Sequence, residues 1–108
     1  SKGPVYLNAG IWDVEDANER YAAYLFSSDT TVDGIWLDLT ANADGTYSVV
    51  LPAGYDYVIF ARMDGASTEN EWANAWNQTN DLSLVGYYGK TFTIESWGDG
   101  ANSQGRWN

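Results

Sequence analysis

Two groups of acidic residues in this chain have side chains that could act as general acids or bases. Asp13, Glu15 and Asp16 lie in one short polar stretch, and Glu69 and Glu71 lie in another. A glycosidase needs two carboxyl groups that face each other across a cleft, at least one of them with a raised pKa. Sequence neighbours in a polar loop are instead solvated and repel one another. We therefore predict that the chain has no catalytic residues and is not an enzyme.

A second pattern, with Asn42, Asp44 and Gly45 at its centre, resembles the start of a helical calcium-binding loop. Such a loop closes on a bidentate Glu, whereas Leu51 occupies that position here. We expect a tight turn before Tyr47 instead. The chain also has no His and no Cys, the usual ligands of zinc, and His is the commonest general base. We predict no metal site and no cofactor; an irregular, carbonyl-rich calcium site stays open.

Aromatic side chains are the third candidate, and their number is the main clue. The chain has six Trp, eight Tyr and three Phe among 108 residues. A core of this size cannot hold so many large rings, so several are expected at the surface. A sugar ring stacks its C–H groups on a flat aromatic ring, and its hydroxyl groups bind Gln, Asn, Asp or backbone groups at the edge. This composition favours a carbohydrate-binding surface.

The net charge of −10 limits the possible partners. Binding to nucleic acid or to an anionic membrane requires clustered Lys and Arg, which this chain lacks. We therefore predict neither partner. A strongly acidic protein is better suited to a neutral ligand, such as a polysaccharide.

Short β-rich runs separated by turn signals would have to position these side chains, and they predict a sandwich or barrel. The expected strands are Val5–Asn8, Glu19–Phe26, Ile35–Leu39, Thr46–Leu51, Asp56–Arg62 and Lys90–Ser96, with a weaker one near Asp81–Leu84. Val58, Phe60 and Ile59 are the candidate core residues. Any helix is expected as a short turn near 67–77, where Trp72 and Trp76 are four residues apart.

The chain reads as one domain over residues 1–97, followed by a Gly-rich loop or linker start over residues 98–108. Its opening residues carry no pattern of a signal peptide, so the chain is expected to be a mature or excised part of a larger protein.

The order of the segments resembles that of the starch-binding carbohydrate-binding modules of family 26 and, more loosely, of family 25. The segments that carry the resemblance are "VYLNAGIW", "YAAYLF", "GIWLDL", "GTYSVVLP", "YVIFARM" and "WNQTNDLSL". They cover about residues 4 to 95, and the last segment is the most specific. The resemblance implies an immunoglobulin-like antiparallel β-sandwich that binds α-1,4-linked glucans without a metal.

By position, the resemblance implies that Tyr24 and Trp36 form an aromatic platform and that Gln78 hydrogen-bonds to sugar hydroxyls. The family often has another aromatic residue two positions before the Tyr, where this chain has Ala22, and the segment 64–76 is longer than usual. We therefore add Trp72 and Trp76 as candidate ligand-binding residues, either as replacement rings or as caps of the core. Arg62 is a further possible hydrogen-bond donor without an assigned role.

These observations predict a non-catalytic module that binds starch-type glucan. The module is expected to be secreted or at the cell surface, within a larger multidomain extracellular protein. Two alternatives remain. An immunoglobulin-like structural or adhesion domain would share the strand pattern but would not need exposed Trp residues. A binding module for β-glucan or mannan would need a different arrangement of its rings, since a flat ligand requires a flat platform and a curved α-glucan requires rings set at an angle.

Overall fold

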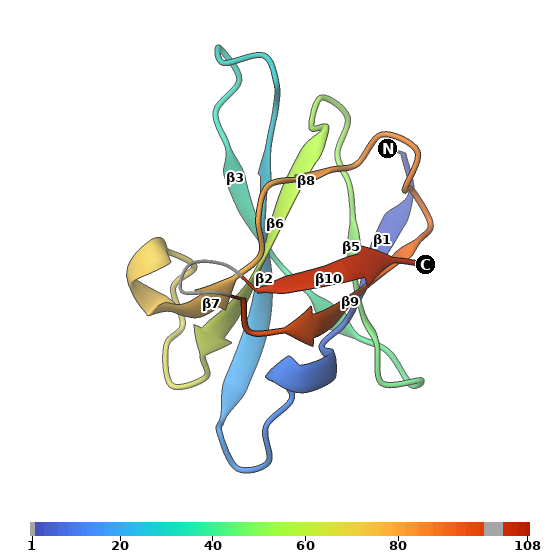
Figure 1. The fold of residues 1–108 in the computed structure, drawn as a ribbon. Coiled ribbons are helices and arrows are strands. Elements are labelled where there is room, and N and C mark those ends of the chain that lie inside the picture. Colours follow the sequence, from blue (N-terminus) through green and yellow to red (C-terminus); the bar gives the residue numbers. More distant parts are fainter. Residues whose placement is uncertain (1, 99–102) are drawn as a thin grey trace.

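The protein is an all-β sandwich of two sheets, shown in Figure 1 from a computed structural model that describes residues 2–98 and 103–108. The β1 sheet has the strand order β10-β9-β1-β5-β4, and the β2 sheet has the order β3-β2-β6-β7 with β8 also paired to β6. The β1 sheet consists of β1 (Pro4–Asn8), β4 (Thr40–Ala41), β5 (Tyr47–Val50), β9 (Thr91–Ser96) and β10 (Gln104–Trp107). The β2 sheet consists of β2 (Glu19–Phe26), β3 (Ile35–Asp38), β6 (Tyr57–Asp64), β7 (Ala75–Gln78) and β8 (Leu82–Ser83). The predicted all-β sandwich is confirmed.

The main core lies between the sheets, and β6 contributes to it most directly. Val58 and Phe60 point inward and are fully buried. Side chains alternate along a strand, so Ile59 and Ala61 point to the outer face of the β2 sheet, where they are buried as well. The predicted core residues of this strand are confirmed, because β6 is a central strand covered on both faces.

The strand directions differ from the strictly antiparallel arrangement that the sequence led us to expect. β1 pairs with β9 in parallel, from Tyr6 opposite Thr91 to Asn8 opposite Thr93. The neighbouring pairs of the same sheet are antiparallel. The β1 sheet is therefore mixed. Local alternation determines which residues form a strand and which face each residue occupies, but it carries no information on the direction of a partner far along the chain.

In the described residues, helical structure consists of two single turns. The turn η2 (Trp72–Asn74) lies within the expected segment 67–77. The second turn, η1 (Gly10–Trp12), lies outside it, so the restriction of helix to that segment was wrong. Gly10 has a φ of 53°, and the side chain of Asn8 accepts its N–H at 3.1 Å. The turn places the ring of Trp12 in the core, where Nε1 donates to Oγ of Ser103 at 2.8 Å.

The C-terminal range 98–108, predicted as a loop or linker start, contains the strand β10. Figure 1 shows β10, in red, beside β9. Trp107 packs edge-on against Phe92, with ring centroids 5.3 Å apart, and stacks on Tyr87 at 5.1 Å. The loop prediction is therefore wrong for residues 104–107, while residues 99–102 lie outside the described residues. The expected strands also omitted β4 and β7.

Candidate functional site

Three aromatic side chains lie together on the outer face of the β2 sheet. Tyr24 on β2 is directly opposite Trp36 on β3, and their ring centroids are 5.2 Å apart. Trp72, on the turn η2, lies 4.5 Å from Trp36 and 5.2 Å from Tyr24 by the same measure. We call these three side chains the ring platform. The structure thus brings together three of the five candidate residues.

The alternation of β2 explains the outward position of Tyr24. Tyr21 and Leu25 on the same strand point inward and are buried in the core. Gly34, just before β3, makes room for the ring of Tyr24, because a Cβ at this position would collide with the Tyr24 hydroxyl. The absence of a side chain at Gly34 therefore lets the Tyr24 ring lie along the end of β3.

The floor of the platform is apolar. Ala22, Ala61 and Met63 form a small buried cluster on this outer face, and Trp36 packs against it. Ala22 occupies the position where the family resemblance implies another aromatic residue. Its small side chain is fully buried beside the larger rings, and Trp72 supplies the third ring from a loop instead.

The rings are exposed and inclined to one another. Trp72 is 40% exposed, and Tyr24 and Trp36 are half-buried. The ring planes of Trp36 and Trp72 meet at 61°, as do those of Tyr24 and Trp36, and Tyr24 and Trp72 meet at 58°. The platform is therefore angular rather than flat.

Gln78 lies on the same face of the sheet as the platform. It pairs with Ala61 on β6, which in turn pairs with Ala22 on β2, so the three residues form one row across the sheet. Neighbouring strands are about 4.8 Å apart, which places Gln78 about 10 Å from β2. Within the described part of the chain its side-chain amide makes no hydrogen bond.

Trp76 lies apart from the platform and contacts Arg62. The Arg62 guanidinium carbon is 5.1 Å from the ring centroid of Trp76 and 5.4 Å from that of Trp97. The two rings are 45% and 46% exposed, while the Arg62 side chain is only 10% exposed. Both rings thus cover a cation. Trp72 and Trp76 do not share a helical turn, because the turn ends at Asn74 and Trp76 belongs to a strand.

The contacts of Arg62 show the role of this side chain, which the sequence left unassigned. Its Nε donates to the backbone oxygen of Trp12 at 2.9 Å, and Nη1 donates to Oδ1 of Asn77 at 3.2 Å. Nη2 forms an ion pair with Glu19 at 3.4 Å, and the Glu19 side chain is only 6% exposed. A buried charge is costly unless it is paired, and these contacts pair it. Arg62 is a structural residue at the edge of the core.

The suspected calcium loop is a tight turn, as predicted. Oδ1 of Asp44 accepts hydrogen bonds from the backbone N–H of Thr46 at 2.9 Å and from its hydroxyl at 2.6 Å. These bonds hold the pKa of Asp44 below its ordinary value. Across residues 2–98 and 103–108, no three His, Cys, Asp or Glu side chains gather where they could hold a metal ion.

An open pocket of about 480 Å³ lies beside the platform rather than on it. None of the five candidate residues lines it, and its aromatic walls, Tyr21 and Tyr47, pack with the main core. The lining residues are Glu19, Arg20, Tyr21, Asp38, Leu39, Tyr47, Ser67 and Thr68. Four of these lie on the strands that carry the platform, namely Glu19, Arg20, Tyr21 and Asp38. The sequence analysis did not select Arg20 or Asp38.

The comparisons leave the family open. No family model, no curated protein and no solved structure matched this chain when it was compared with them. In the described residues, no helix has both the length and the apolar character needed to cross a membrane.

Proposed function

We propose that this protein is a non-catalytic carbohydrate-binding module that holds an α-1,4-linked glucan, such as starch or a maltooligosaccharide, on the ring platform. The observation that carries the proposal is the gathering of Tyr24, Trp36 and Trp72 at centroid distances of 4.5 to 5.2 Å on one outer sheet face. In a soluble protein, an exposed aromatic cluster of this kind marks a binding surface.

The inclination of the rings favours a curved ligand. A flat polysaccharide would lie best on coplanar rings, whereas the ring planes here meet at about 60°. The rings would stack on the C–H faces of successive sugars, and Gln78 would hydrogen-bond to a hydroxyl group at the edge of the platform. The platform contains no charged side chain, which suits a neutral ligand.

The setting of the module follows from the same proposal. We propose that the module meets its glucan outside the cell, secreted or displayed at the cell surface as part of a larger multidomain protein. A glucan-degrading enzyme or a starch-capturing surface protein would use it to remain at its substrate. This assignment also fits the resemblance to family 26 modules, which itself remains a proposal.

Electrophoresis in native gels that contain soluble starch, a β-glucan or a mannan tests the proposal directly. We expect retardation by starch alone, and we expect Trp72→Ala to abolish most of it. Trp97→Ala is the matched control, because Trp97 is similarly exposed but lies outside the platform. Retardation by β-glucan or mannan alone would change the ligand, and no retardation in any gel would favour a structural or adhesion domain.

A further inference from the structure

Trp72 is held in the platform by contacts outside its own turn. The turn η2 has no buried residue, and no side chain caps its N-terminus. A single 3₁₀ turn is not stable by itself, since it fixes several dihedral angles for very few hydrogen bonds. The position of the Trp72 ring must therefore be determined by what anchors the segment of residues 64–74.

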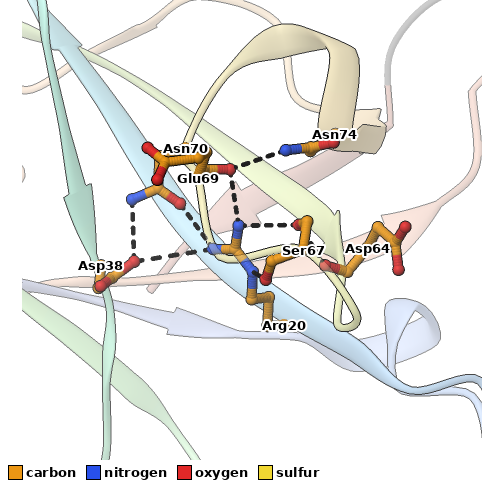
Figure 2. Close-up of polar contacts among 7 residues, drawn as sticks. All are labelled: Arg20, Asp38, Asp64, Ser67, Glu69, Asn70 and Asn74. Carbon is orange, nitrogen blue, oxygen red and sulfur yellow. Dashed lines mark hydrogen bonds and ion pairs between the residues drawn. The ribbon is translucent and has the colours of Figure 1, made fainter.

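Arg20 makes the central contacts that hold this segment, as Figure 2 shows, and we call these contacts the anchor. It lies on β2 and points to the outer face, like Ala22 and Tyr24. Its Nε donates to the backbone oxygen of Ser67 at 3.0 Å, and Nη2 donates to the hydroxyl of Ser67 at 3.0 Å and to the backbone oxygen of Glu69 at 2.9 Å. The planar guanidinium thus fixes the backbone of the segment at two points.

Two Asn side chains extend this anchor on either side of Trp72. Oδ1 of Asn70 accepts a hydrogen bond from Nη1 of Arg20 at 2.6 Å, and its Nδ2 donates to Asp38 on β3 at 2.9 Å. Asp38 also lies 3.7 Å from the Arg20 guanidinium. Beyond Trp72, the side chain of Asn74 donates to the Glu69 oxygen that Arg20 binds, at 3.0 Å. The contacts therefore bracket η2.

The anchor and the platform share two strands. Arg20 and Tyr24 lie on β2, and Asp38 and Trp36 lie on β3, with all four side chains on the outer face. The sheet thus fixes two rings directly and fixes the loop that carries the third. The Arg20 side chain is 23% exposed, so its hydrogen bonds compete only partly with water.

We propose that Arg20, with Asn70 and Asp38, is a positioning residue that sets the place and the inclination of Trp72 against Trp36. The anchor thereby determines that the platform is angular, and it makes the platform selective for a curved α-glucan. The effect on the ring geometry is independent of any ligand, whereas the effect on selectivity rests on the proposed function.

Circular dichroism measures the geometry without a ligand. Two indoles whose centroids are 4.5 Å apart couple their electronic transitions and give a pair of bands of opposite sign. Trp72→Phe should remove this couplet and thereby identify it. We expect Arg20→Ala to reduce it by more than half, and Arg20→Lys to restore it only in part, because Lys lacks the planar fork. Arg106→Ala, which removes an exposed ion pair with Glu95, is the matched control.

Isothermal titration with maltoheptaose measures the consequence for binding. We expect Trp72→Ala and Arg20→Ala each to weaken affinity about tenfold. The double variant should bind no more weakly than Trp72→Ala alone, since both changes remove the same ring contact. Asn70→Ala repeats the test from the exposed loop, should Arg20→Ala fail to fold.

The outcomes separate the two proposals. An unchanged couplet in Arg20→Ala and Asn70→Ala, with Trp72→Phe removing it, would overturn the positioning role. Additive losses of affinity in the double variant would overturn the coupling of Arg20 to Trp72. A couplet that depends on Arg20 in a protein that binds no maltoheptaose would support the positioning role and contradict the α-glucan function instead.

Discussion

Trp36 has two roles at once, because its ring lies over a small apolar cluster and also forms part of the exposed platform. Trp36→Ala should weaken glucan binding at least tenfold, or about 1.4 kcal/mol. It should also lower the free energy of unfolding by about 1–3 kcal/mol, less than a fully buried ring would cost. Urea unfolding and starch titration on the same variant give both values.

Trp76→Ala is the contrasting variant. It removes a ring that covers Arg62, so it should reduce stability but leave the affinity for starch within about twofold. A Trp36→Ala protein that is folded at the temperature of the assay and binds as well as the wild type would contradict the platform assignment. So would a Trp76→Ala protein that remains stable but no longer binds.

Gln78 provides a test of hydrogen bonding separate from ring stacking. Gln78→Ala should weaken binding by about 0.5–1.5 kcal/mol, because a half-exposed hydrogen bond competes with water. Stability should change little, since the amide has no partner in the described residues. Asn77→Ala, one residue earlier, removes an acceptor of Arg62 and should show the opposite pattern. Calorimetric titration of both variants distinguishes a ligand contact from a structural one.

At the scale of elements, the strand β10 should stabilise the domain rather than lead out of it. Deletion of residues 103–108 removes the packing of Trp107 on Phe92 and the buried hydrogen bond between Trp12 and Ser103. We expect a loss of at least about 3 kcal/mol, seen as a lower midpoint of urea unfolding. A deletion variant with the midpoint of the full chain would restore the linker interpretation.

The sequence predicted those elements whose own residues determine them. Strands β2 and β6 have continuous β-forming residues and clear alternation, which also placed Val58 and Phe60 in the core. Strand β10 could not be predicted, because "QGRW" is short and has a single large apolar side chain, and its stability comes from pairing with β9. The parallel direction of β9 beside β1 depends likewise on contacts distant in the sequence.

The candidate site was predicted in the same partial way. The family resemblance, rather than alternation, selected Tyr24 and Trp36, and in the structure each occupies an outward position on a regular strand. The place of Trp72 depends on the contacts of Arg20 with a loop, and no local pattern shows them. The position of Trp76 depends on the register shift of the β6–β7 ladder between Arg62 and Met63, which alternation alone does not reveal.

At the scale of the whole molecule, Tyr21 should make stability sensitive to alkaline pH. Burial, and then the neighbouring charge of Glu19, raise the pKa of Tyr21 well above its ordinary value of 10.0. A group with a raised pKa in the folded state contributes stability that is fully present below its unfolded pKa and is lost as pH rises further. The free energy of unfolding should therefore fall above about pH 10.

Tyr21→Phe isolates this effect. The variant should lose about 1 kcal/mol near neutral pH with its bond to Glu19, but its stability should decline less steeply above about pH 10. Tyr87→Phe, at an exposed position, should retain the slope of the wild type. Urea unfolding over this pH range provides the comparison, and equal slopes in all three proteins would exclude Tyr21 as the source.

The charge of the whole molecule leads to a prediction about salt and metal. With a net charge of −10, a charged ligand would interact with the long-range field of the protein, whereas a neutral glucan would not. Affinity for maltoheptaose should therefore change less than about twofold when salt is raised from roughly 50 mM to 500 mM, where screening becomes nearly complete. A steep fall of affinity with salt would indicate a charged ligand.

Addition of a chelator should likewise have no effect on the affinity for maltoheptaose, because the platform uses rings and an amide. Loss of binding with the chelator at an unchanged melting temperature would instead show that a metal ion takes part in recognition.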